Sequence, residues 1–229
     1  MFGDRLWLRL FVRLIRIIVK QGENIMAPVP KGSTVAVTGA AGFIGGWVVR
    51  GLLDRGYRVR ACVRDTNDGT KTDFLRQMPG YASGRLTLHS ANLDEAGCFD
   101  DVFSGCQGVC HVSHVSTYDD PEYMRGVCEH VIASINNSGT VNRVVVTSSI
   151  AAIISEADLQ ELVRRPVFYE DRYPDEESPK RTTERGQGYS MGKVELERLF
   201  TDAAEAHGGW DCIRVCPADN VGPILSAHQ

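Results

Sequence analysis

Polar side chains in the second half of the chain have the types and spacing needed for proton transfer to a carbonyl oxygen. Tyr189 and Lys193 are four residues apart, so a helix would project both from one face. A lysine cation about 4 Å from a tyrosinate stabilises it by on the order of 4 kcal/mol at an effective dielectric near 20, or roughly three pKa units. That shift would make tyrosine, whose usual pKa is about 10, an effective acid at neutral pH. A serine hydroxyl of Ser148-Ser149 could donate to the same oxygen as charge develops on it.

The Tyr-x-x-x-Lys spacing is common on helix surfaces, so its meaning depends on the elements that position it. The clearest of these is an apolar run, residues 34–38, that leads directly into Gly39, Gly42 and Gly45. Glycine permits a tight turn and a close backbone approach, and the free N–H groups at the start of the next helix attract an anion. The stretch predicts a dinucleotide pyrophosphate site, in preference to an ordinary strand-to-helix turn.

The residues that follow the second expected strand indicate which dinucleotide is bound. An acidic residue about 20 positions after the glycines would bind a free ribose 2′-hydroxyl. This chain has Arg64 there, with Lys71 seven residues later, and a guanidinium suits a 2′-phosphate that a carboxylate would repel. Asp65 is the competitor, because it would favour NAD if it faced the ribose. Arg64 as a solvated surface charge is the remaining alternative, and we expect NADP(H).

Strand-like and helix-like segments alternate along the rest of the chain. Strands are expected at 34–38, 57–63, 85–89, 108–112, 143–147 and 212–216. Helices are expected after the glycine turn and at 72–78, 95–103, 122–135 and 189–206. This alternation predicts an α/β fold, a Rossmann-type doubly wound parallel sheet with helices on both faces and a ligand site at the carboxyl ends of the strands. We expect the folded domain to cover residues 33–223.

The composition favours small molecules as ligands. The 229 residues carry a formal net charge of −4, and the body of the chain has no basic face of the kind that binds nucleic acid. The seven cysteines lie mostly in apolar strand-like runs, which favours a reducing compartment and a cytoplasmic protein. Cys106, Cys110, His111 and His114 match no common zinc spacing. We therefore expect no metal site, but buried thiols and a structural histidine.

The first 32 residues differ in composition from the rest. Cations recur along residues 5–20 within one narrow stripe of a helical wheel, and apolar side chains cover the remainder. These cations interrupt every apolar run before the roughly 20 residues that a bilayer span needs. Two interpretations remain open: an interfacial or organelle-targeting segment with weak membrane-surface contact, and a non-structural extension before a start at Met26. Residues 27–32 are expected to form a linker.

Taken together, four motifs resemble the extended short-chain dehydrogenase/reductases of the epimerase/dehydratase superfamily, and most of all their dihydroflavonol reductase and cinnamoyl-CoA reductase branch. The motifs occupy residues 38–45 (TGAAGFIG), 59–65 (VRACVRD), 145–149 (VVTSS) and 189–193 (YSMGK). The resemblance implies a catalytic trio of Ser149, Tyr189 and Lys193, with Tyr189 as general acid. It further implies that the cofactor contacts Gly39, Ala41, Gly42, Phe43, Ile44 and Gly45 at the pyrophosphate, Arg64 and Lys71 at the 2′-phosphate, Asn92 and Leu93 at the adenine, Val112, Ser113 and His114 near its centre, and Pro217 and Asn220 beside the nicotinamide. Tyr189 and Lys193 are also expected to contact the cofactor, and Lys193 can hold its ribose.

The chain also departs from that branch. It has Asn92-Leu93 where Asp-Leu is usual, and Gly186-Gln187-Gly188 where lignin-type cinnamoyl-CoA reductases carry Asn-Trp-Tyr-Cys-Tyr. After Gly222-Pro223 the family continues for roughly another hundred residues, so we expect residues 224–229 to be a truncated tail and most of the substrate-binding subdomain to be missing. The favoured function is NADP-dependent reduction of a ketone, aldehyde or thioester carbonyl. The alternatives are a nucleotide-sugar epimerase or dehydratase, and a truncated cofactor-binding protein without turnover.

Overall fold

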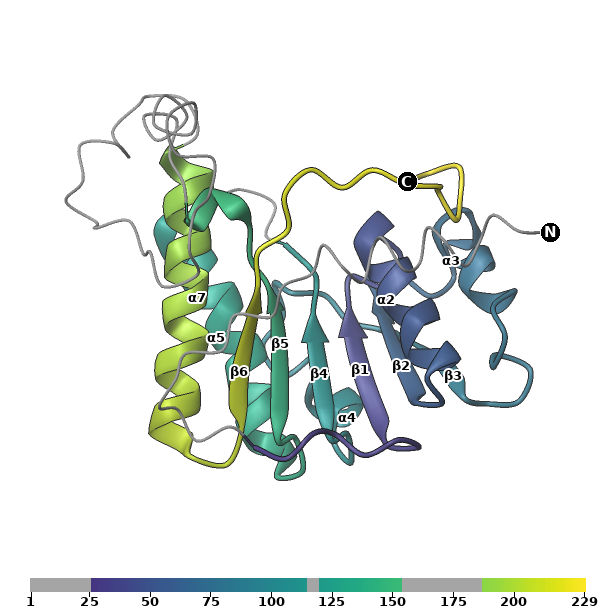
Figure 1. The fold of residues 1–229 in the computed structure, drawn as a ribbon, viewed down its shortest axis with the longest axis horizontal. Helices are drawn as coiled ribbons and strands as arrows, with labels where there is room; N and C mark the ends of the chain where they lie inside the picture. Colours follow the sequence, from purple (N-terminus) through teal and green to yellow (C-terminus); the bar gives the residue numbers. More distant parts are fainter. Residues whose placement is uncertain (1–25, 115–119, 154–186) are drawn as a thin grey trace, which may run out of the picture.

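The computed structural model describes residues 26–114, 120–153 and 187–229, and these form a six-stranded parallel sheet with helices on both faces (Figure 1). The strands are β1 (Thr34–Thr38), β2 (Arg58–Val63), β3 (Leu86–Ser90), β4 (Gly108–His111), β5 (Arg143–Thr147) and β6 (Asp211–Val215). The helices are α2 (Phe43–Asp54), α3 (Gly69–Arg76), α4 (Asp100–Phe103), α5 (Pro121–Ser138), α7 (Gln187–His207) and the 3₁₀ turn η1 (Ile150–Ala152). The predicted Rossmann-type fold is confirmed.

The strand order is β3-β2-β1-β4-β5-β6, so the first strand of the chain, β1, lies in the middle of the sheet beside β4. Chain order runs outward from β1 in one direction through β2 and β3, and from β4 in the other direction through β5 and β6. Parallel pairing of β1 with β4 brings Thr38 opposite His111 at the carboxyl ends of these two strands. In an open parallel sheet, ligands bind in the crevice at such a reversal of strand order. The fold therefore places the ligand site between the glycine turn after β1 and the loop after β4.

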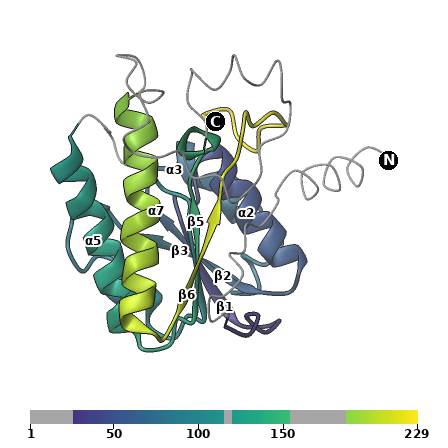
Figure 2. The ribbon, with the colours of Figure 1, turned by 60° about the vertical axis from the view of Figure 1, so that its left-hand side comes forward.

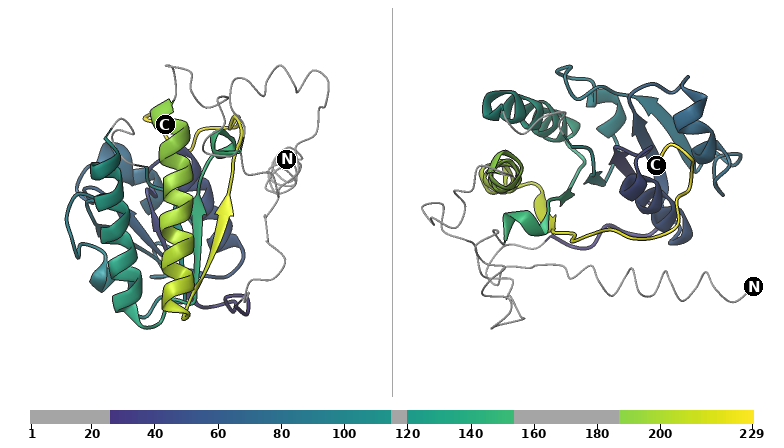
Figure 3. Two further views of the ribbon diagram at one scale, coloured as in Figure 1. Left: turned by 90° about the vertical axis from the view of Figure 1, so that its left-hand side faces the viewer. Right: turned by 90° about the horizontal axis from the view of Figure 1, so that it is seen from above.

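Alternating side chains of the strands divide the core into two layers, one on each face of the sheet. Figures 2 and 3 show α5 and α7 on one face of the sheet and α2 on the other. Ala36 belongs to the layer covered by α4, α5 and α7, while its neighbour Val37 belongs to the layer covered by α2 and α3. Successive residues of a strand point to opposite faces, so both layers require apolar side chains along β1. This explains why the central strands are nearly continuous apolar runs.

One expected helix is much shorter than the sequence pattern indicates. A helix was predicted over 95–103, but only α4, Asp100–Phe103, is helical, and consecutive turns occupy the residues before it. Gly97 has a φ of 76°, a left-handed conformation that interrupts a right-handed helix. The N–H of Asp100 bonds to the carbonyl of Gly97 at 3.0 Å, so this turn leads directly into the short helix. The other expected helices and strands are present, with ends that shift by up to three residues.

The basic stretch expected at residues 5–20 lies outside the described ranges. Among the described residues, no helix is both long and apolar enough to cross a membrane.

Candidate functional site

The turn after β1 has a shape that only glycine fits at two positions. Gly39 has a φ of 66°, and a Cβ there would lie 2.9 Å from the backbone N and Cα of Ser113. A Cβ on Gly45 would lie 2.0 Å from the carbonyl oxygen of Gly39, far inside van der Waals contact. The turn is closed by a 3.0 Å bond from the N–H of Gly42 to the carbonyl of Gly39. Gly39 and Gly45 therefore allow α2 to start directly against the turn.

The amino-terminal end of α2 is left open toward solvent. The N-cap residue is Gly42, whose lack of a side chain leaves the first N–H groups of the helix without a side-chain cap. Such groups carry partial positive charge and favour a phosphate. Phe43 and Ile44, the first helical residues, line a cavity of about 610 Å³. The open helix end therefore faces a space of the size that small ligands occupy.

Most of the residues expected to contact a cofactor line this one cavity. It contains Gly39, Ala41, Gly42, Phe43, Ile44, Gly45, Arg64, Asn92, Leu93, Val112, Ser113, His114 and Asn220. The cavity thus extends from the glycine turn, past the ends of β2 and β3, to the loop after β4. Four of the expected contacts do not line it: Lys71, Pro217, Tyr189 and Lys193. Lys71 pairs with Asp68 at 3.6 Å on α3, and the carbonyl of Pro217 accepts a 2.9 Å bond from the N–H of Ile150.

The cavity wall also includes residues that were not among the expected cofactor contacts. These are Cys62, Val63, Ala91, Asp94, Phe99 and Tyr123. The hydroxyl of Tyr123, at the start of α5, donates to the Asp94 carboxylate at 2.7 Å. This bond joins residues 29 positions apart, and neither residue belongs to a recognisable motif, so sequence reasoning could not pair them.

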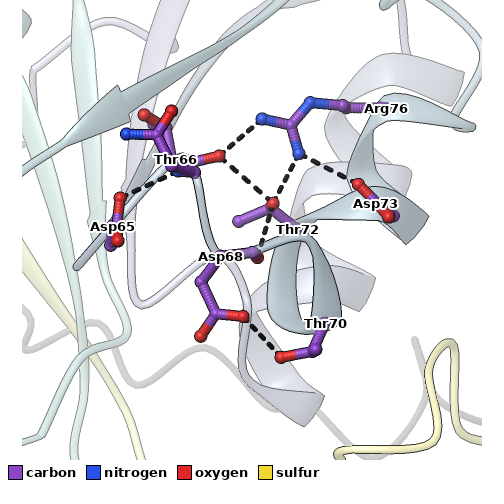
Figure 4. A network of polar contacts seen from close by, with 8 residues as sticks. Asp65, Thr66, Asp68, Thr70, Thr72, Asp73 and Arg76 are labelled. Atoms are coloured by element: carbon purple, nitrogen blue, oxygen red, sulfur yellow. Dashed lines mark hydrogen bonds and ion pairs between the residues drawn. The ribbon is translucent and has the colours of Figure 1, made fainter.

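Arg64 and Asp65 directly follow β2 but have different surroundings, and Figure 4 shows the contacts around Asp65. Arg64 lines the cavity, whereas the Asp65 carboxylate accepts a 2.8 Å bond from the N–H of Asn67 within its own turn. Arg76 of α3 braces the same turn by donating to the carbonyl of Thr66 and to the hydroxyl of Thr72. Arg76 therefore stabilises the turn after β2, and Arg64, not Asp65, lies at the cavity.

Thr38 and His111 connect β1 to β4 beneath the cavity. The Thr38 oxygen accepts the N–H groups of Val112 and Ser113 at 3.1 and 3.2 Å, which uses both of its lone pairs. Its own hydrogen is therefore donated to Nδ1 of His111, 2.9 Å away, and the histidine carries its proton on Nε2. Burial lowers the pKa of His111 to about 3, with a smaller contribution from the nearby Lys193 cation.

These contacts give His111 the structural role expected from the sequence. Its ring stacks on Phe200 of α7 at 5.2 Å, on one face of the sheet, while the adjacent Cys110 packs in the layer on the other face. The two side chains cannot share a metal ion when they lie on opposite faces. Among the described residues, no group of histidine, cysteine or acidic side chains is arranged to hold one.

Tyr189 and Lys193 lie on one face of the first turns of α7, beside the end of β5. The Lys193 ammonium donates to the carbonyl of Thr147 at 3.0 Å and lies 5.7 Å from the centroid of the Tyr189 ring. Lys193 is 4% exposed and Tyr189 is 42% exposed, so the cation is buried beneath a tyrosine that reaches solvent. Burial lowers the pKa of Lys193 to about 8, partly offset by Cys128, Glu197 and Cys216. At pH 7 the ammonium form therefore prevails by roughly ten to one.

Ser148 and Ser149 follow β5 and have different partners. The Ser148 hydroxyl donates to the buried carboxylate of Glu197. Ser149 is the N-cap of η1, and its oxygen accepts the N–H of Ala151 at 3.1 Å, a bond that does not use the hydroxyl hydrogen. The hydroxyl of Ser190, next to Tyr189, donates to the carbonyl of Ala151 at 2.6 Å. The start of α7 is therefore fastened to the segment that carries Ser149.

The last residues of the chain pack against the glycine turn. The segment after β6 runs along the carboxyl edge of the sheet to α2 and α3, as the yellow trace in Figure 1 shows. Trp47 donates to the carbonyl of Pro223 at 3.0 Å, and Leu225 packs on the core layer of α2 and α3. Gln229 donates to the carbonyls of Ala41 and Gly42 at 3.1 and 3.2 Å. These bonds use carbonyl groups of the turn and none of its N–H groups.

The described residues fit a dinucleotide. The glycine turn has no room for a Cβ at Gly39 or Gly45, the open end of α2 suits a pyrophosphate, and Arg64 adds a cation at the end of β2. The cavity continues toward the loop after β4, and the Tyr189–Lys193 pair lies at the same edge of the sheet, at the end of β5. The cavity and the Tyr189–Lys193 pair therefore lie at one edge of the sheet.

Residues 35–229 match the NAD dependent epimerase/dehydratase family, and the chain belongs to this family. Dihydroflavonol 4-reductase of Zea mays is 37% identical over 203 residues, which cover 86% of this chain and 55% of that protein. Cinnamoyl-CoA reductase CAD2 of Medicago truncatula is 46% identical over 130 residues, covering 53% of this chain and 39% of that protein. These matches confirm the resemblance found in the motifs.

Solved structures show the same fold. Vestitone reductase from alfalfa is 25% identical, with a TM-score of 0.58 over 80% of this chain and 55% of that one. Gre2 from Candida albicans, solved in complex with NADPH, has a TM-score of 0.64 over 85% of this chain and 60% of that one, and its 22% identity supports the fold alone. The chain spans about half the length of the curated relatives it matches.

Proposed function

We propose that this protein is an NADP-dependent reductase that transfers hydride to the carbonyl group of a small organic substrate. The observation that carries the proposal is the buried Lys193 ammonium beneath the exposed Tyr189 ring, at the edge of the sheet that also holds the dinucleotide cavity. A carbonyl reduction needs a proton donor beside a hydride source, and this arrangement supplies the donor. The names of the similar plant proteins, which are reductases, support the same reaction class.

In the proposed reaction, bound NADPH supplies the hydride and the chain supplies the proton. Tyr189 donates its phenolic proton to the carbonyl oxygen, and the Lys193 cation favours the tyrosinate that remains. Ser149 donates its hydroxyl hydrogen to the same oxygen, because its bond to Ala151 uses only a lone pair. The bond from Lys193 to the carbonyl of Thr147 holds the cation in place without neutralising it.

The surroundings of Arg64 support NADP over NAD. Arg64 is exposed at the cavity, where its guanidinium can pair with a 2′-phosphate. The Asp65 carboxylate is engaged by the N–H of Asn67 and does not line the cavity, so it is not placed to bind a ribose hydroxyl. An epimerase or dehydratase that keeps NAD bound would need an acidic group at this place.

The test is an NADPH-oxidation assay of the purified chain with a panel of ketones, aldehydes and thioesters. Tyr189→Phe removes the proton donor and keeps the ring, so turnover should fall by about 10²–10⁴-fold. Binding of NADPH, followed by its fluorescence, should change little. Tyr81→Phe is the matched control, because Tyr81 is also exposed but lies in the turn before β3. Undiminished turnover in Tyr189→Phe, or no NADPH oxidation with any carbonyl compound, would reject the proposed function.

A further inference from the structure

A buried carboxylate lies directly behind the proposed catalytic residues. Glu197 is one helical turn after Lys193 on α7, so both side chains project from the face that packs on the sheet. Glu197 is only 2% exposed, which is rare for an acidic residue because burying a carboxylate is costly unless hydrogen bonds compensate. The burial of Glu197 therefore indicates that its carboxylate has a specific role in the structure or the reaction.

The partners of Glu197 belong to two neighbouring strands. Its Oε1 atom accepts from the Ser148 hydroxyl, directly after β5, and from the Cys216 thiol, directly after β6, at 3.5 Å. The N–H of Ser148 also bonds to the carbonyl of Val215 at 2.8 Å. One carboxylate oxygen thus joins α7 to the carboxyl ends of both β5 and β6.

The bond between Glu197 and Ser148 holds the residue next to Ser149, which is proposed to donate a hydrogen bond to the substrate carbonyl. Ser149 follows Ser148, and adjacent residues in extended backbone point in opposite directions. Anchoring Ser148 toward α7 therefore sets the direction in which Ser149 points. Ser149, which the sequence assigns to catalysis, is therefore positioned by Ser148. Ser148 is in turn held by Glu197 of α7, 49 positions later in the chain.

Glu197 also supplies the negative charge near Lys193. The titratable groups that affect Lys193 or are affected by it are Glu197 and Tyr189 on α7, Cys128 on α5, Cys216 after β6 and His111 on β4. Burial raises the pKa of Cys128 and of Cys216 to about 12, so both thiols are neutral at pH 7. His111 is neutral as well, because burial keeps its pKa at about 3. Within this group, the Glu197 carboxylate is the counter-charge for the buried ammonium.

We propose that Glu197 is a positioning residue of the active site, whose carboxylate anchors Ser148, and through it Ser149, and keeps the buried Lys193 in its charged form. The part that concerns catalysis rests on the proposed function. The part that concerns Lys193 does not, because it describes the free protein.

The first experiment measures the titration of Lys193 in the free protein by NMR of lysine labelled with ¹³C at Cε. The Lys193 signal is assigned by its absence in Lys193→Met. Glu197→Gln keeps the shape and removes the charge, so the titration midpoint of Lys193 should fall by about one pH unit. Glu195→Gln is the matched control: Glu195 lies on the same helix but pairs with the exposed Arg125, and the midpoint should stay in place. An unchanged midpoint in Glu197→Gln, or an equal shift in the control, would overturn the proposal.

The second experiment tests positioning by steady-state kinetics. Ser148→Ala removes the anchor and leaves the Glu197 charge, so kcat should fall by about tenfold, while KM and the Lys193 midpoint stay near their wild-type values. In Glu197→Gln the alkaline limb of the kcat/KM profile should also move to lower pH. Should Glu197→Gln not fold, as judged by circular dichroism, Ser148→Ala decides the matter, and full activity there would contradict the positioning role. Undiminished turnover in Tyr189→Phe would instead reject the proposed function and leave the Lys193 result standing.

Discussion

The two halves of the site are built by different means. The region around β1, α2 and β2 offers a ligand mostly backbone: a glycine turn, the open end of a helix and a cavity with one exposed arginine. The region around β5, α7 and β6 offers side chains that long-range bonds hold in place, such as Lys193 on Thr147 and Glu197 on Ser148. The shape of the first region depends on the absence of side chains at its glycines. The geometry of the second region depends on hydrogen bonds between side chains and distant parts of the chain.

This difference predicts how each region fails. A backbone site tolerates little added volume, because main chain atoms cannot move aside without disturbing the sheet and helix that carry them. A buried polar network tolerates volume-conserving changes but not the loss of a partner or a charge. Substitutions that add a methyl group and substitutions that remove a charge should therefore separate the two regions.

The largest effect is expected from Gly45→Ala. The new Cβ would lie 2.0 Å from the carbonyl oxygen of Gly39, so the turn must open, and we expect a loss of about 3 kcal/mol in the free energy of unfolding together with the loss of NADPH binding. Gly126→Ala is the control, because Gly126 lies within α5 with open space around its Cα, and alanine favours a helix. Urea denaturation measures the free energy of unfolding of each variant, and NADPH fluorescence measures its cofactor binding. Equal stability of the two variants would show that the turn is not sterically limited.

A smaller effect is expected where the first region does depend on a side chain. Arg64→Asp should weaken NADPH by about 10–100-fold, because it replaces a charge-assisted bond to the 2′-phosphate with repulsion, and should change NADH binding little. Arg58→Asp is the control, since Arg58 is exposed at the opposite end of the same strand. Dissociation constants for both cofactors decide the matter, and equal weakening of NADPH and NADH would indicate a structural role for Arg64.

The smallest effect at neutral pH concerns His111, where the two regions meet, because its contribution grows only as the pH falls. Its pKa is lowered to about 3 from 6.5, so the unfolded chain binds a proton that the folded chain does not between those values. Stability should therefore fall as pH falls through this window, by at most about 1.4 kcal/mol per pH unit from this group. His111→Gln can still accept from Thr38 and should remove that part of the acid sensitivity. Unfolding free energies of both proteins at pH 7, 6, 5 and 4 test this, and parallel curves would contradict it.

Several requirements of the first region are local and therefore readable from the sequence. Gly45 has no room for a Cβ beside the carbonyl of Gly39, six positions earlier, and Gly39 has a positive φ, while Arg64 follows β2 directly. The close approach of Ser113 to Gly39 is a tertiary contact that the sequence does not show. One local prediction was wrong: the helix over 95–103 has the right composition, but the left-handed conformation of Gly97 limits it to its last four residues. Apolar spacing alone does not show which glycine will interrupt a helix.

The sequence by itself determined the parallel α/β fold, the glycine turn and the helical pairing of Tyr189 with Lys193, because period, turn chemistry and i, i+4 spacing are properties of neighbouring residues. Only the tertiary structure decided that Thr38 bonds to His111, that Tyr123 reaches Asp94 and that Glu197 anchors Ser148. Each of these bonds joins residues 29 to 73 positions apart. The order of the strands brings these residues together. Thr38, His111, Ser148 and Glu197 are buried, so these bonds replace the water that their polar atoms lose on folding.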